Sequence, residues 1–181
     1  MTQQDTQRHS FYLAYRTNKR MINANNTFVM QLNIETQKNN TTDFTPLIKA
    51  TKEHFFDRNT KRQTNRQDLS IDIHFADEQT MIKLNKQYRD KDYLTDVLSF
   101  SYLDNLLDHE SLAGEIFISL EKAQTQAKEK GNSLETEIIY LISHGYLHIT
   151  GYLHDTDQQE AEMNLEEDWI LSNSGNYKIN R

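Results

Sequence analysis

The chain of 181 residues contains no cysteine. This absence excludes disulfide bonds, thiolate-ligated zinc and a cysteine nucleophile. Long apolar runs are missing as well, because the longest, Ile138 to Ile142, falls far short of the ~20 residues that cross a bilayer. The first residues lack the charged, apolar and small-residue order of a signal peptide. We therefore expect a cytoplasmic protein without a membrane partner.

Basic residues are outnumbered by acidic ones. Lysine and arginine total 20 against 27 aspartate and glutamate residues, which gives a formal net charge of −7. This balance argues against nucleic-acid binding through overall charge. The charge is uneven, however, since residues 49–66 are mostly basic and residues 155–168 carry acidic residues without a basic one. Such runs are usually solvated surfaces, but a local basic stripe is what a phosphate backbone contacts.

The apolar periodicity predicts one domain with the element order β-α-β-α-β-β-α-α-α. Predicted strands cover 28–34, 69–75, 97–100 and 116–118. Predicted helices run from Pro46 to about 56, from Asp77 to Tyr88, over about 120–130, from 133 to Gly151, and onward from Thr156. We expect an α/β (α+β) fold in which helices cover one small mixed sheet of about four strands. Residues 1–27 are expected to be a flexible extension, 28–172 the domain and 173–181 a tail.

The last predicted helix has a clear start signal. Thr156 and Gln159 have the spacing of a capping box. Ala161, Leu165 and Trp169 follow at helical spacing, so we expect them to form the buried face of this helix.

Three histidines stand within eleven residues, at positions 144, 148 and 154. Because residues four apart share one face of a helix, His144 and His148 can bind the same ion. Gly151 stands where a helix would end at positive φ, after which the chain can present His154 from the other side. Three imidazoles can hold a divalent metal and leave one position open for water. His144, His148 and His154 are therefore predicted to be metal ligands.

The remaining histidines are scattered along the chain, and we interpret them as ordinary core or surface residues. They are His9, His54, His74 and His109.

Neutral histidine ligands leave the charge of an ion uncompensated, which favours Lewis-acid chemistry. Zinc in such a site lowers the pKa of its water from 15.7 to about 7 and so supports hydrolysis. We expect one Zn²⁺, although three histidines also suit nickel, copper or iron. The spacing H-x-x-x-H-x-x-G-x-x-H matches that of metzincin peptidases, which need glutamate directly after the first histidine. Gly145 occupies that position, so a peptidase is disfavoured.

The segment HGYLHITGYLH resembles the H-G-x-L-H-L-x-G-Y-D-H signature of the YbeY family. Upstream, residues 84–89 and 95–100 resemble the family's L-N-x-x-Y-R and T-D-V-L-S-F, and Gly114-Glu115-Ile116 resembles its G-D-I. Ser133-Leu134-Glu135 leads into the histidine helix as it does in the family. The resemblance covers roughly residues 28–172 and is most specific over 84–154.

This resemblance implies a single-strand-specific, metal-dependent endoribonuclease that acts in 16S rRNA 3′-end maturation and ribosome quality control. It implies RNA and the ribosome as partners, no DNA partner, zinc as the usual metal, and His144, His148 and His154 as its ligands. Arg89 matches the family's cleft arginine and is the predicted catalytic residue, since a guanidinium can contact a phosphate bidentately. A non-catalytic ribosome-associated factor with a structural metal is an alternative, although structural zinc usually has four protein ligands.

Three positions depart from the family pattern. Leu153 and Glu115 stand in place of aspartate, and Ser101 in place of proline. Leu153 removes no ligand but leaves out a carboxylate beside the ligands, a kind of loss that costs roughly 10- to 100-fold in affinity or activity. Asp155 is close enough in sequence to substitute for it. Asp96 and Ser99 are expected to brace their strand.

Overall fold

A computed structural model describes residues 31–34, 43–57, 69–103 and 112–181. Its elements are β1 (Gln31–Ile34), α2 (Thr45–Asp57), β2 (Ser70–Ala76), α3 (Glu78–Arg89), β3 (Val97–Ser101), β4 (Leu112–Ser119), α4 (Leu120–Lys130), α5 (Leu134–Ile149) and α6 (Asp157–Asn173). This order confirms the predicted one. The expected extension, residues 58–66 of the basic segment 49–66, His9 and His109 lie outside the described residues.

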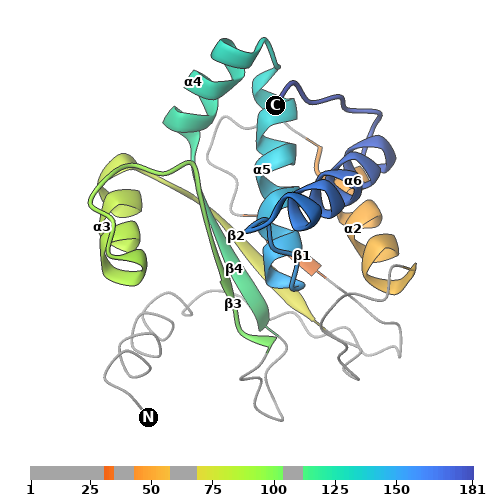
Figure 1. Ribbon diagram of the computed structural model, residues 1–181, viewed down its shortest axis with the longest axis horizontal. Helices are drawn as coiled ribbons and strands as arrows, with labels where there is room; N and C mark the ends of the chain where they lie inside the picture. The colour runs from red at the N-terminus through yellow and green to blue at the C-terminus, as the bar shows by residue number, and fades with distance from the viewer. Residues whose placement is uncertain (1–30, 35–42, 58–68, 104–111) are drawn as a thin grey trace.

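The described strands form one mixed sheet, as expected, and their order in it is β1-β2-β4-β3. Strands β1, β2 and β4 are parallel, and β3 runs antiparallel to β4. Side chains alternate between the two faces, so Ile116 and Ile118 of β4 point to the face that α5 covers. Figure 1 shows the sheet between α5 and α3. No helix in the described ranges is long and apolar enough to span a bilayer.

Helix α5 is the centre of the main core and lies very close to β4. A Cβ added at Gly145 would lie 3.0 Å from Cγ2 of Ile116, and one at Gly114 would lie 2.8 Å from Cδ1 of Ile149. The two glycines therefore allow the helix and the strand to approach where larger residues would hold them apart. This approach fixes the height of the histidine helix above the sheet.

A smaller core lies on the other face of the sheet, where α3 packs. It consists of Met81, Leu84, Leu98 and Phe117. Asp77 caps α3 as predicted by accepting a hydrogen bond from the Thr80 amide. The Asp96 carboxylate accepts from the Val97 amide and from Gln126 of α4, so it braces β3 as expected.

The prediction for the buried face of α6 was wrong at two positions. Ala161 is exposed and Leu165 is 70% exposed, whereas Trp169 packs against the main core. The buried residues of this helix are Met163, Glu167, Ile170 and Leu171. The apolar pattern misleads here because a glutamate, buried against polar partners, occupies a place on the inner face.

Candidate metal centre

Helix α5 and the turn after it bring the three predicted ligands together. The helix ends at Ile149, and Gly151 takes the expected positive φ of 103°. The chain then returns, so that one ring nitrogen of each of His144, His148 and His154 lies within 4.8 Å of the other two. His144 and His148 are half-buried, whereas His154 is exposed.

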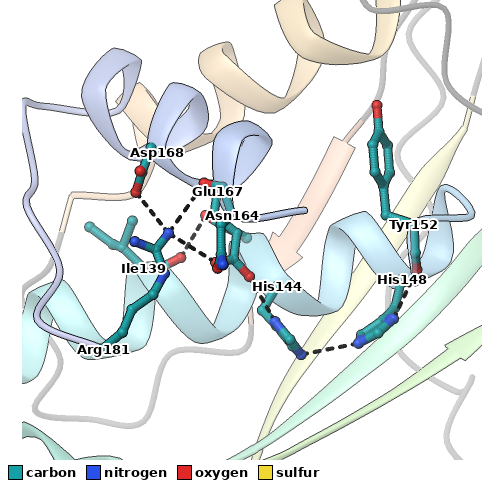
Figure 2. A network of polar contacts seen from close by, with 9 residues as sticks. Ile139, His144, His148, Tyr152, Asn164, Glu167, Asp168 and Arg181 are labelled. Atoms are coloured by element: carbon teal, nitrogen blue, oxygen red, sulfur yellow. Dashed lines mark hydrogen bonds and ion pairs between the residues drawn. The ribbon is translucent and has the colours of Figure 1, made fainter. Parts of the chain in front are cut away.

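Both helix histidines have their outward ring nitrogen fixed by a protein acceptor. Nδ1 of His144 lies 2.8 Å from Oε1 of Glu167, and Nδ1 of His148 lies 3.0 Å from the Tyr152 carbonyl oxygen. A carboxylate and a carbonyl accept hydrogen bonds, so each Nδ1 carries the proton and donates it. In a neutral ring, the Nε2 atom then presents a lone pair. Figure 2 shows this chain of contacts.

The two Nε2 atoms point at each other across 3.0 Å. With both Nδ1 atoms protonated, two neutral rings place two lone pairs face to face, which is unfavourable unless a cation lies between them. Two nitrogens on a tetrahedral zinc at about 2.0–2.1 Å from the ion are roughly 3.3 Å apart. The donor set and its spacing therefore fit a divalent metal, with His154 as the third ligand.

The surroundings keep His148 in the form that a metal needs. Burial, followed by the neighbouring His144, lowers the pKa of His148 to about 4, although its hydrogen bond to Tyr152 acts in the opposite direction. Below that value the ring would be protonated and unable to coordinate. At neutral pH, His148 is thus ready to bind a metal.

Arg89 lies at the exposed C-terminal end of α3, within electrostatic reach of the triad. Its positive charge is among the causes that lower the pKa of His148, although it is the smallest of them. No carboxylate of the described residues pairs with its guanidinium. Arg89 can therefore meet an anionic group that approaches the histidines from solvent.

His54 and His74, the other two histidines that the structure describes, have partners outside the triad. His54 is buried and contacts the Tyr146 hydroxyl and Glu166, each at 3.1 Å. His74 is buried and lies 3.2 Å from Glu115, which also accepts a hydrogen bond from the Tyr102 hydroxyl. Both histidines are hydrogen-bonded core residues, as we interpreted them.

Two of the departures from the family pattern take clear places. Ser101 donates a hydrogen bond to the Ile149 carbonyl oxygen at 3.1 Å and so ties β3 to the end of α5. Leu153 is 46% exposed beside the triad. The carboxylate that contacts a triad histidine belongs to Glu167, and the role considered for Asp155 stays a prediction.

Glu167 was missed by the sequence reading. It stands 23 positions after His144 within the acidic run 155–168, and the pattern gives no sign that it is buried. The sequence shows only that Glu167 follows Glu166 on a long predicted helix. Because α6 crosses both α5 and α2, these adjacent glutamates reach a histidine on each helix, His144 and His54.

Gly145 bears directly on the peptidase alternative. A Cβ added at Gly145 would lie 3.0 Å from Cγ2 of Ile116 on the sheet. A glutamate at this position would first crowd Ile116, and the chain carries no such side chain there, which disfavours a metzincin-type base.

Comparison with known proteins decides the family. The sequence profile described as endoribonuclease YbeY matches residues 31–175. The chain belongs to the YbeY family. It is 44% identical over 108 residues to "Endoribonuclease YbeY" of Alkaliphilus oremlandii, which covers 58% of this chain and 72% of the relative. It is 38% identical over 112 residues to the protein of the same name from Malacoplasma penetrans, which covers 62% and 75%.

Among solved structures, the solution structure of TM1509 from Thermotoga maritima is similar to this chain. The two are 24% identical, with a TM-score of 0.46, over 78% of this chain and 90% of TM1509.

Proposed function

We propose that the protein is a metal-dependent endoribonuclease that cuts single-stranded RNA, with one Zn²⁺ held by His144, His148 and His154. The observation that carries the proposal is the pair of Nε2 lone pairs that converge across 3.0 Å in a member of an endoribonuclease family. Family membership supports RNA as the substrate. We further propose the 3′ end of 16S rRNA as the target, the ribosome as the partner and the cytoplasm as the location.

The protein's own groups have distinct tasks in this reaction. Glu167 and the Tyr152 carbonyl hold the protons on Nδ1, so that Nε2 of His144 and of His148 stays free for the metal. A bound ion supplies Lewis acidity and a water of lowered pKa. Arg89 contacts the scissile phosphate and stabilises the negative charge that develops on it. The exposure of His154 and Arg89 leaves the substrate side of the site open.

The test combines metal analysis with cleavage. Purified protein is analysed for bound metals and incubated with a labelled single-stranded RNA that carries the 16S 3′ end, and with the same RNA as a duplex. We expect about one zinc per chain and cleavage of the single strand only. His148→Ala should lose both metal and cleavage.

The matched control is His74→Gln, which removes a histidine on the other face of the sheet. It should keep the metal and the cleavage of the wild type. Full cleavage by His148→Ala without bound metal would contradict the proposal, as would cleavage of protein substrates in place of RNA.

A further inference from the structure

The segment 174–181 lies back along the molecule instead of projecting from it. Ser174 is buried, and Tyr177 and Ile179 pack against the main core. The Tyr177 hydroxyl donates to Glu135 at 2.7 Å, and the Asn180 amide donates to Asn132 at 3.0 Å. These contacts tie the segment to the start of α5 and bring its last residue onto α6.

Arg181 ends this segment beside the carboxylate that holds His144. One of its guanidinium nitrogens, Nη2, lies 3.2 Å from Oε2 of Glu167, 2.7 Å from Oδ1 of Asp168 and 3.2 Å from the Asn164 carbonyl oxygen. Figure 2 shows the continuous path from Arg181 through Glu167 to His144 and His148. Both oxygens of Glu167 thus have a partner: His144 on one side and Arg181 on the other.

The burial of Glu167 makes the second partner important. Its side chain is 2% exposed with Arg181 in place, so Arg181 is what covers its second oxygen and donates to it. A buried carboxylate oxygen without a donor costs free energy and favours rotation of the side chain toward another partner. Asp168 next to it adds a further negative charge, which Arg181 also neutralises. Without Arg181, the second oxygen of Glu167 would lose the contact that holds it in place, and the carboxylate could rotate out of line with Nδ1 of His144.

We propose that Arg181 is a positioning residue of the metal centre, which acts through Glu167 to fix the ring of His144. The inference rests on the proposed function, because it assigns His144 to a metal. It goes beyond that function because the match to the family ends at residue 175, and Arg181 lies outside it. The segment 174–181 thereby tunes the affinity of this particular chain for its metal.

The first experiment measures zinc affinity by competition with a chromophoric chelator. Glu167→Gln should lower the affinity about 10- to 100-fold, the usual effect of losing a ligand's hydrogen-bond partner. Arg181→Ala should lower it less, by about 3- to 10-fold on the same scale. Arg181→Lys, which keeps the charge, should recover part of the loss. The control Tyr177→Phe removes a hydrogen bond of the same segment and should leave the affinity unchanged.

The second experiment needs neither metal nor RNA. Long-range ¹H–¹⁵N NMR of the metal-free protein reports which ring nitrogen of His144 carries the proton. We expect the Nδ1–H form in the wild type and in Tyr177→Phe, and a mixture of both forms in Arg181→Ala. Unchanged tautomer and unchanged zinc affinity in Arg181→Ala would overturn the inference.

The two proposals can fail separately. If the wild type binds zinc and cleaves RNA while Arg181→Ala equals it in both measurements, only the inference on Arg181 is wrong. If Arg181→Ala changes the tautomer and the zinc affinity while the wild type leaves RNA intact, the inference stands and the proposed function is wrong.

Discussion

The candidate metal centre has an inner half and an outer half that are built differently. The inner half is His144 and His148, which share one helix, are half-buried and have their Nδ1 atoms fixed by Glu167 and Tyr152. The outer half is His154 and Arg89, which are exposed at a return segment and at the end of α3. Within the described part of the chain, no hydrogen bond orients the ring of His154.

The difference separates two tasks. Preorganised ligands on a rigid helix lose little freedom when they bind an ion, so the inner half is suited to set metal affinity. Exposed groups meet the substrate first and can adjust to it, so the outer half is suited to contact RNA. If this division holds, substitutions in the two halves should affect different measurements.

The largest expected effect is the loss of an inner ligand. His148→Ala should lower zinc affinity by more than the roughly 100-fold that marks the loss of a ligand's outer contact. His154→Ala should lower it less, because the preorganised pair on α5 remains. Competition titrations with a zinc chelator measure the zinc affinity of both variants. Equal losses in the two variants would show that the halves do not differ.

Arg89 should show the opposite pattern. Arg89→Ala is expected to lower kcat for RNA cleavage about 10²- to 10³-fold, the usual loss when one donor to a developing charge is removed. Its zinc affinity should equal that of the wild type, since Arg89 contacts no triad nitrogen. Arg89→Lys should fall in between, because it keeps the charge and loses the bidentate fork. A parallel loss of zinc would place Arg89 in the inner half.

The sequence predicted the parts of this arrangement that depend on neighbours along the chain. The i,i+4 histidine pair, the turn at Gly151 and the caps at Asp77 and Thr156 follow from local backbone geometry, and the structure has them as expected. The order of strands and helices follows equally from local periodicity.

The contacts between helices could not be predicted in the same way. Glu167 reads as one more acidic residue of a solvated run, and only the packing of α6 on α5 buries it against His144. The same packing leaves Leu165 exposed, although its apolar side chain suggested the reverse. The inner face of α6 combines the apolar Met163, Ile170 and Leu171 with Glu167, and this one carboxylate interrupts the apolar pattern by which the face would be recognised.

The close approach of α5 to the sheet is a further property of the inner half. Gly145→Ala would place a Cβ 3.0 Å from Cγ2 of Ile116, so the Ile116 side chain has to shift within a tightly packed core. We expect a loss of about 1–3 kcal/mol in the free energy of unfolding, the usual cost of overpacking a core. Urea denaturation measures it.

Ile116→Val serves as the matched partner of this substitution. It removes Cδ1 of Ile116, which would lie 3.1 Å from the added Cβ, and leaves Cγ2. It should therefore restore part of the stability of Gly145→Ala, so the double variant should be more stable than the sum of the single losses predicts. Strict additivity would show that Gly145 and Ile116 do not limit the approach.

The last effect concerns pH and again distinguishes the inner half. Burial, with His144, lowers the pKa of His148 to about 4 in the folded protein, whereas an unfolded chain binds this proton near pH 6.5. Between these values the unfolded state binds more protons, so stability rises with pH and is lost as pH falls from about 6.5 toward 4. Urea midpoints of the metal-free protein at pH 7, 5.5 and 4.5 should therefore decline. The decline should be shallower in His148→Gln, which has no such proton to bind, and identical slopes in the two proteins would remove His148 as its source.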